Sequence, residues 1–212
     1  MNFIDIHTHR HCSDNEVVVV KSTLWDREYS SECLYSVGIH PWDSGRVSLQ
    51  EARCWLESHS DAIAVGECGF DFASGRSELK AQQRLFELQL EYAHSQGLPM
   101  LIHCVKGYNE LLEMTRDYQK VQFVVHGFNG SAQLAEQLLK RNFNLSFGAM
   151  IIRSEKLQNL LRWLPIENIL METDDSSVGI REVYECVGRV KSIEIESLKE
   201  LIYNNFKRIF EL

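Results

Sequence analysis

The sequence predicts an α/β protein built as a compact (β/α)8 barrel, the architecture of TIM-like enzymes. Short apolar runs alternate with amphipathic segments along the chain, and eight of these runs have the composition of strands. Histidines and carboxylates follow several runs directly, as in barrels whose strands present polar side chains at one mouth. An open doubly wound sheet shares the alternation, but the chain has neither GxGxxG after its first strand nor a Gly-rich phosphate loop.

Length and composition favour a single domain. The 212 residues, 44% of them hydrophobic, suffice for one substantial core, so we expect one domain over residues 1–212. The six cysteines form no CxxC pair, and neither a signal peptide nor a membrane-spanning run is evident. We therefore expect a cytoplasmic protein with reduced thiols. The formal net charge of −8 predicts local rather than extensive contacts with phosphates.

Each expected strand is a short run of apolar or β-branched residues. The strands are expected at residues 3–9, 16–21, 33–37, 62–65, 100–103, 121–125, 143–147 and 168–171. Helices after the first two strands are reduced or missing, because residues 22–32 show no helical periodicity and indicate a loop. This shortening places the barrel near the small end of its class.

Helical periodicity follows the later strands. The clearest helix begins near Leu79 and is stopped by Gly97 and Pro99. Ser131 is expected to cap a helix that runs through Leu138. Further helical segments are expected around residues 52–56, 108–115, 157–164 and 198–209.

Two histidines end the first strand. Because side chains alternate along a strand, Asp5, His7 and His9 share one face, and Ile4 and Ile6 cover the other. Two neutral imidazoles that converge form half of a transition-metal site. An isolated pair is explained more simply as a polar strand end, so the metal hypothesis depends on ligands from other strands. Asp5 is expected to orient a ligand histidine or to pack at the barrel mouth.

Other strands supply further candidate ligands. A histidine or carboxylate ends the third, fourth, fifth, sixth and eighth strands, in the order His40, Glu67, His103, His126 and Asp174. A hydrogen bond at a loop junction would explain any one of these histidines alone. Together with the first pair they predict a metal centre at one mouth of the barrel. His11 is expected in an entrance loop.

Six short motifs occur in chain order at these strand ends. They are Asp5-Ile6-His7-Thr8-His9, Gly38-Ile39-His40-Pro41, Gly66-Glu67-Cys68-Gly69-Phe70-Asp71, Ile102-His103, Val125-His126-Gly127-Phe128-Asn129-Gly130 and Glu172-Thr173-Asp174. In this order they resemble the motifs of the TatD family, metal-dependent deoxyribonucleases with a TIM-barrel fold in the amidohydrolase superfamily. The resemblance covers the whole chain, down to Asn205 and Phe210.

The resemblance implies a binuclear site for two divalent metal ions. His7, His9 and Asp174 would hold one ion, His103 and His126 the other, and Glu67 would bridge them. Two-metal sites of this kind stabilise the attacking and leaving oxygens of a phosphodiester. Mixed nitrogen and oxygen ligands suit Zn, Mn, Ni or Co, whereas Mg is common among nucleases but prefers oxygen.

The resemblance also implies a reaction and a substrate. A metal-activated water would attack phosphorus, with Asp174 as proton acceptor and Glu67 as the second catalytic carboxylate. The expected activity is that of a deoxyribonuclease or 3′–5′ exonuclease. Its partner would be DNA, single-stranded or at 3′ ends, or a small phosphorylated substrate. His40 and Lys106 are expected to bind substrate, and the oligomeric state stays open.

The chain departs from the family pattern around the substrate. After His103 it has Cys104-Val105-Lys106, where the family usually has an Arg, and Asp174 is followed by Asp175-Ser176-Ser177 instead of Ala-Pro-Tyr. A lysine replaces the charge of an arginine but not its bidentate geometry. Two alternatives therefore stand beside a nuclease. One is a phosphoesterase or amidohydrolase acting on a small molecule, and the other is a non-catalytic binding protein on the same fold.

Overall fold

A computed structural model of the protein describes residues 1–10, 14–25, 33–75 and 78–212. His11 and most of the loop expected at residues 22–32 lie outside the described residues. The chain divides into two compact units: a first unit formed by Met1–Lys21 and His126–Leu212, and a second unit formed by Ser22–Val125.

The first unit contains parallel strands from both ends of the chain. β1 pairs with β2, β7 pairs with β8, and a parallel bridge joins Thr8 of β1 to Asp174 beyond the end of β8. Its strands are β1 (Phe3–Thr8), the first part of β2 (Val17–Leu24), β7 (Phe143–Phe147) and β8 (Ile169–Met171). Its helices are α4 (Ala132–Leu139), α5 (Met150–Arg153), α6 (Glu155–Trp163), α7 (Ile180–Lys191) and α8 (Ile195–Phe210), with a 3-10 turn η2 (Ile166–Asn168).

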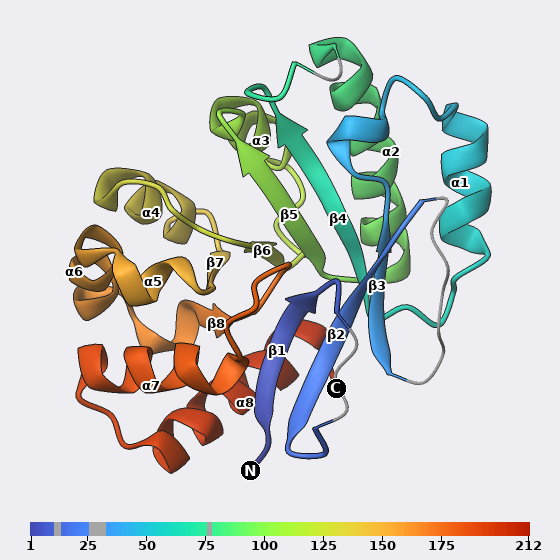
Figure 1. Ribbon diagram of the computed structural model, residues 1–212. Coiled ribbons are helices and arrows are strands. Elements are labelled where there is room, and N and C mark those ends of the chain that lie inside the picture. The colour runs from blue at the N-terminus through green and yellow to red at the C-terminus, as the bar shows by residue number, and fades with distance from the viewer. Residues whose placement is uncertain (11–13, 26–32, 76–77) are drawn as a thin grey trace. The chain divides into compact units, whose positions relative to one another are not determined.

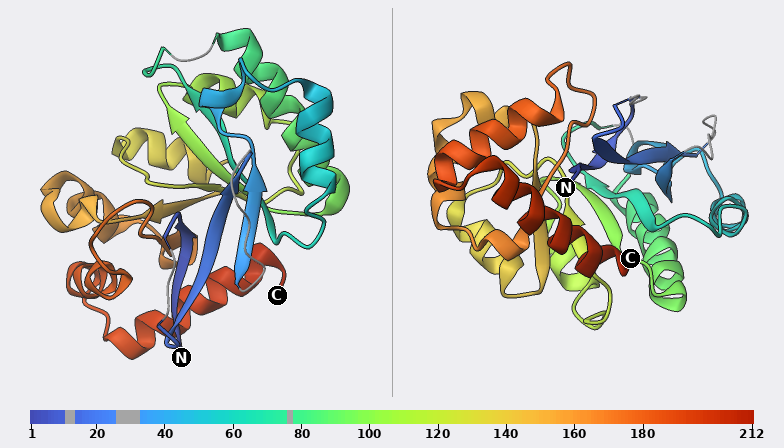
Figure 2. Two further views of the ribbon diagram at one scale, coloured as in Figure 1. Left: turned by 45° about the vertical axis from the view of Figure 1, so that its right-hand side comes forward. Right: turned by 90° about the horizontal axis from the view of Figure 1, so that it is seen from below.

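Helices α7 and α8 cover β1 and β8 (Figure 2). Every residue of β1 is buried, because one face packs on these helices and the other carries the polar residues of the strand end. Tyr184 of α7 fixes the packing, since its hydroxyl lies 3.0 Å from the backbone nitrogen of Ile4 and 3.2 Å from its carbonyl oxygen. The α7 helix is thereby tied to the strand that ends in His7.

The second unit contains four parallel strands in chain order (Figure 1). They are β3 (Leu34–Gly38), β4 (Ala64–Asp71), β5 (Met100–Val105) and β6 (Phe123–Val125). The connections carry a 3-10 turn η1 (Pro41–Asp43) and the helices α1 (Leu49–Glu57), α2 (Leu79–Gln96) and α3 (Tyr108–Met114). Helix α2 packs against β4 and beside α1, and α3 contacts both β4 and β5.

Several local predictions are confirmed. Gly97 ends α2 in the left-handed region with φ of 67°, and the Ser131 side chain caps α4 by accepting a hydrogen bond from the Leu134 N–H. The described residues between β1 and β2, and those between β2 and β3, contain no helix. The single helix expected at residues 157–164 begins earlier, at Glu155, where Ser154 caps α6 directly after α5.

Three strands are longer than the sequence predicts. β2 runs to Leu24, into the segment expected to be a loop, and β4 and β5 run through their motifs to Asp71 and Val105. Glu67 and His103 therefore lie inside strands rather than at their ends. The glycines of the β4 motif suggest that the strand ends before them. Here they instead permit close approach of β4 to β5, because a Cβ on Gly69 would lie 2.1 Å from the His103 carbonyl oxygen.

No helix in the described part of the chain is both long and apolar enough to cross a membrane.

Candidate metal centre

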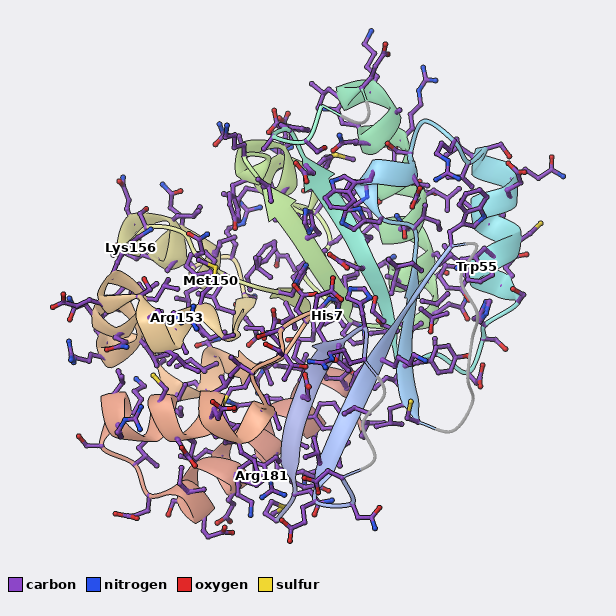
Figure 3. The ribbon with its side chains drawn as sticks, in the orientation of Figure 1. His7, Trp55, Met150, Arg153, Lys156 and Arg181 are labelled. Atoms are coloured by element: carbon purple, nitrogen blue, oxygen red, sulfur yellow. The ribbon has the colours of Figure 1, made fainter. Side chains whose placement is uncertain are left out.

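His7, His9 and Asp174 converge in the first unit. The Nε2 atoms of His7 and His9 lie 3.6 and 3.5 Å from the same carboxylate oxygen, Oδ1 of Asp174. His7 is fully buried near the end of β1 (Figure 3), His9 is partly exposed, and their rings meet edge to face with centroids 5.1 Å apart. These three side chains meet as the sequence predicts for one half of the site.

Backbone contacts bring the carboxylate to the histidines. The Asp174 N–H donates to the His7 carbonyl at 2.9 Å, and the His9 nitrogen lies 3.5 Å from the Asp174 carbonyl oxygen. Asp174 itself has φ of 52°, in the left-handed region that few residues other than glycine occupy. Strain of this kind persists only where the surroundings impose it, and it is common at functional sites.

His126 and Glu172 extend this group within the first unit. The ring of His126 lies 4.4 Å from that of His7, and its Nδ1 lies 3.4 Å from Oε1 of Glu172. One ligand atom each from His126, Glu172 and Asp174 lies within 4.8 Å of the others. Glu172 is only 1% exposed, so a buried carboxylate faces His126 on the nitrogen that a metal bound at Nε2 would leave free. In the sequence, Glu172 is marked only by its place in the motif Glu172-Thr173-Asp174, and no role was predicted for it.

Asp5 does not orient a histidine through a direct hydrogen bond. Its carboxylate accepts hydrogen bonds from the Thr173 N–H at 3.0 Å and from the Thr173 hydroxyl at 2.6 Å. Burial raises the pKa of Asp5 to about 7, although these hydrogen bonds act to lower it. Of the two roles expected for Asp5, the structure shows no direct hydrogen bond to a ligand histidine; the carboxylate instead packs against the segment that carries Glu172 and Asp174.

Glu67, His103 and His40 form a second group, within the second unit. Oε1 of Glu67 lies 3.0 Å from Nδ1 of His103 and 3.4 Å from Nε2 of His40. Glu67 and His40 are buried, whereas the His103 side chain is 16% exposed. The rings of His40 and His103 meet edge to face, with centroids 4.5 Å apart. One imidazole nitrogen of His40 and one of His103 therefore face the same carboxylate oxygen.

The tautomer of His40 distinguishes it from His103. The Trp42 N–H donates to Nδ1 of His40 at 3.2 Å, so neutral His40 carries its proton on Nε2. That proton faces Oε1 of Glu67 at 3.4 Å, so His40 in this tautomer presents no lone pair on the side of the carboxylate. The family resemblance likewise implies that His40 binds substrate rather than metal, and this contact with substrate stays a prediction.

Asp71 was not expected in the site, yet it contacts His103. Its Oδ2 lies 3.3 Å from Nε2 of His103 and accepts a hydrogen bond from Nε1 of Trp42 at 2.6 Å. Burial alone would raise the pKa of Asp71, but hydrogen bonds from Trp42 and from the backbone N–H groups of Ser74 and Ala73 hold it below its usual value. The only sequence signal was its place four residues after Glu67 in a recognised motif.

Of the two predicted substrate-binding residues, Lys106 is exposed and His40 is buried. Lys106 follows β5 with φ of 60° and an exposed side chain. In the first unit, Nη1 of Arg10 donates to the Ser176 carbonyl at 2.6 Å, which fixes the altered segment after Asp174. Asp175 in that segment is exposed. The role of Lys106 stays a prediction.

The donor sets of both groups fit divalent transition metals. Each combines imidazole nitrogens with carboxylate oxygens, a mixture that suits Zn, Mn, Ni or Co. Ligand atoms of His7, His9 and Asp174 lie within 4.8 Å of one another, as do those of His40, Glu67 and His103. The tautomer of His40 leaves Glu67 and His103 as the ligand candidates of the second group.

The chain is similar to proteins described as metal-dependent hydrolases and exonucleases. It is 25% identical over 197 residues to "Uncharacterized metal-dependent hydrolase YabD" of Bacillus subtilis, covering 84% of this chain and 77% of that protein. It is 30% identical over 154 residues to "3'-5' ssDNA/RNA exonuclease TatD" of Citrobacter rodentium, covering 69% of this chain and 59% of that protein. The chain thus spans well under two thirds of the length of the Citrobacter exonuclease.

A solved structure and a family model agree with these relatives. The crystal structure of YjjV, a TatD homologue from Escherichia coli K12, superimposes with a TM-score of 0.84 at 22% identity, covering 99% of this chain and 98% of that one. This likeness confirms the predicted (β/α)8 fold class. The model of the family described as "TatD related DNase" matches residues 15–211. Since that match includes nearly the whole chain, the protein belongs to the TatD family of metal-dependent hydrolases.

Proposed function

We propose that the protein is a metal-dependent nuclease that removes nucleotides from the 3′ end of single-stranded DNA. The observation that carries the proposal is the convergence of His7, His9 and Asp174, whose imidazole nitrogens both approach one carboxylate oxygen within 3.6 Å. This arrangement supplies two nitrogens and one oxygen to a single divalent ion. Membership of a family described as related to DNases supplies the reaction class.

The assignment of ligands to two ions rests on the family motifs. We assign His7, His9 and Asp174 to one ion, His103 and His126 to the other, and Glu67 to both. Two observations support parts of it: His126 lies beside His7, and His103 lies beside Glu67. Bound divalent ions would polarise the phosphodiester and lower the pKa of an attacking water.

The residues of the chain have separate tasks in this reaction. Asp174 would accept the proton of the attacking water, and its side chain is 44% exposed, so water reaches it. Nε2 of His40 lies 3.4 Å from Oε1 of Glu67 and would help to keep the carboxylate in position. His7 is fully buried and would act only as a ligand, whereas Lys106, whose side chain is exposed, would contact a phosphate.

The net charge of the chain supports a substrate that is contacted at only a few phosphates. The net charge of −8 opposes extended contacts with a duplex, whose binding normally uses a broad basic surface. A single strand held at its 3′ end needs only the metal ions and a few cations at the last phosphates. The name of the Citrobacter relative, which describes a single-strand exonuclease, points in the same direction.

A small phosphoester is the second candidate substrate. The exposed Asp175 directly follows the catalytic candidate Asp174, and its negative charge would repel the next phosphate of a polynucleotide. A short substrate has no such phosphate. This local charge is the one observation that favours a small phosphorylated molecule over DNA.

One assay separates these candidates. Metal-free protein is supplied with Mg, Mn, Co, Ni or Zn and given a 3′-labelled single-stranded oligonucleotide or a nitrophenyl phosphodiester. The proposal expects release of labelled 5′-mononucleotide with at least one metal. Turnover of the small ester alone would favour the second candidate, and turnover of neither with any metal would overturn both.

A further inference from the structure

The imidazole of His103 lies between two carboxylates of the second unit. Its Nδ1 is 3.0 Å from Oε1 of Glu67, and its Nε2 is 3.3 Å from Oδ2 of Asp71. A neutral imidazole has one N–H and one lone pair, so it donates to one carboxylate and presents its lone pair toward the other. Which nitrogen carries the proton therefore decides where His103 binds a metal.

Several hydrogen bonds hold Asp71 in place, so its carboxylate can determine which nitrogen of His103 carries the proton. Its Oδ1 accepts hydrogen bonds of 2.9 Å from the backbone N–H groups of Ala73 and Ser74. Its backbone is clamped by the buried Gln82, whose Oε1 accepts from the Asp71 N–H at 2.8 Å and whose Nε2 donates to the Asp71 carbonyl at 3.0 Å. Its Oδ2 also accepts a hydrogen bond from Nε1 of Trp42 at 2.6 Å, so both oxygens already act as acceptors for N–H groups.

We propose that Asp71 is a positioning residue that keeps the proton of His103 on Nε2 and so presents the Nδ1 lone pair to a metal ion at Glu67. The inference rests on the proposed function only in taking Glu67 and His103 as ligands. Histidines that bind metals commonly donate their other N–H to a carboxylate, which fixes the tautomer and the ring orientation. Glu67 cannot fix the tautomer in this way, because it faces Nδ1, the nitrogen that would bind the metal.

The same oxygen of Asp71 also binds Trp42, which provides a control. Nε1 of Trp42 donates to Oδ2 at 2.6 Å, and the indole is 38% exposed with its ring centroid 4.6 Å from that of His40. If Asp71 served only to anchor Trp42, loss of the indole N–H would have the same effect as loss of the carboxylate. If it acts on His103, the two changes have different effects on metal binding.

The test compares Asp71→Asn with Trp42→Phe. Three neighbours of the Asp71 carboxylate are N–H donors, and the fourth, Nε2 of His103, is one under this proposal. An amide would then turn its NH2 group toward two N–H donors in either orientation. Zn²⁺ and Co²⁺ are titrated into metal-free protein by calorimetry, without nucleic acid. We expect Asp71→Asn to weaken the binding of an ion roughly 10- to 100-fold and Trp42→Phe to leave it within about threefold of wild type.

A spectroscopic measurement on the wild-type chain makes the test independent of folding defects. Nitrogen NMR of the histidine rings, with His103 assigned by its loss in His103→Ala, is expected to show His103 protonated at Nε2 in the Zn²⁺-loaded protein. An Nδ1–H tautomer, or equal weakening of metal binding in Asp71→Asn and Trp42→Phe, would overturn the inference.

A further control separates this inference from the proposed function. His103→Ala must itself weaken metal binding if His103 is a ligand. Unchanged binding in His103→Ala would remove the premise, and the inference with it. Weakened binding in His103→Ala and in Asp71→Asn, without any nuclease activity in the wild type, would leave the inference standing and count only against the choice of substrate.

Discussion

Asp174 combines more constraints than any other candidate ligand described above. Its backbone occupies the left-handed region and is hydrogen-bonded to the end of β1, while its carboxylate faces two imidazoles. The neighbouring Asp175 is exposed and follows in the altered loop. The two adjacent carboxylates thus allow a matched comparison of a site residue with a surface residue.

We predict that Asp174→Asn lowers kcat at least about 100-fold, because an amide binds a divalent ion more weakly and does not accept a proton from water. The comparison variant, Asp175→Asn, changes a carboxylate that is not a predicted metal ligand, so its kcat should fall far less, and any effect of the lost charge should appear in KM. Steady-state kinetics on whichever substrate the wild type turns over provide the measurement, with circular dichroism confirming that both variants fold. Equal kcat in Asp174→Asn and the wild type would contradict the site.

Glu172 carries a prediction about His126. The glutamate is buried and faces Nδ1 of His126 at 3.4 Å, so it is placed to hold the ring with Nε2 free for a ligand role. Glu172→Gln keeps the shape but removes the charge, and we expect one metal-binding step to weaken roughly 10-fold or more. Calorimetric titration measures this, and an unchanged titration would show that Glu172 has no part in metal binding.

The sequence predicted the convergence of ligands better than it predicted their partners. His7 and His9 are marked by the alternation of side chains along the first strand, and the family resemblance adds Asp174 to them. The pairing of Asp71 with His103, and of Glu172 with His126, depends on hydrogen bonds between different strands. No periodicity in a single segment reports such a contact, so both carboxylates were assigned no function.

At the scale of elements, the β4–β5 pair positions the second group of ligands. The two strands are in register from Cys68 with Ile102 to Asp71 with Val105, which sets Gly69 opposite His103. Gly69 has φ of 132°, and a Cβ there would lie 2.1 Å from the His103 carbonyl oxygen. The glycine is therefore required both by backbone conformation and by space.

We predict that Gly69→Ala lowers the free energy of unfolding by roughly 2–4 kcal/mol, through strain and displacement of β5. Gly75→Ala is the matched control, because Gly75 also has positive φ, 64°, but nothing lies within 4 Å of the added Cβ. Gly75→Ala should lower the free energy of unfolding by only about 1–2 kcal/mol. Urea denaturation measures both, and similar losses in the two variants would refute the close contact.

The Tyr184 hydroxyl ties α7 to β1 and provides a pH-dependent prediction. Burial raises the pKa of Tyr184 above its ordinary value of 10.0, so the folded state keeps the proton longer than the unfolded state does. The stabilisation is therefore complete below pH 10 and declines as the pH rises above it.

We expect Tyr184→Phe to lose roughly 1–3 kcal/mol of unfolding free energy at pH 7, because both backbone groups of Ile4 lose a buried partner. The deficit should shrink above pH 10, where only the wild type carries the cost of keeping Tyr184 protonated. Urea titrations of both proteins at pH 7 and pH 10.5 test the sign. A deficit that grows with pH would contradict it.

Elements were predicted well where a periodic pattern had clear ends. Gly97 ends α2 and Ser131 caps α4 as expected, because a helix cap depends only on neighbouring residues in the sequence. The lengths of β2, β4 and β5 were underestimated, since pairing with a neighbouring strand extends a strand through residues that alone favour a turn. Gly66 and Gly69 are the plainest example, because glycine lowers strand propensity but fits the close contact that β4 makes with β5.

For the whole molecule, the fold class followed from the repetition of strand and helix along 212 residues. That pattern is redundant, so errors at single strand ends did not change the result, and the TM-score of 0.84 against a TatD homologue confirms the class. The substrate is a different matter. Lys106, the predicted substrate contact, and Asp175 stand where the chain departs from the family pattern, and no periodicity in the sequence indicates what such residues bind.

The central claim is that this chain binds two divalent ions and needs them for phosphodiester cleavage. The most direct test titrates Mn²⁺ or Zn²⁺ into metal-free protein and records, in the same samples, the ions bound per chain and the 5′-mononucleotide released from single-stranded DNA. The account predicts two ions per chain, with activity rising as the second ion binds. Cleavage by metal-free protein, or saturation at a single ion with full activity, would contradict it.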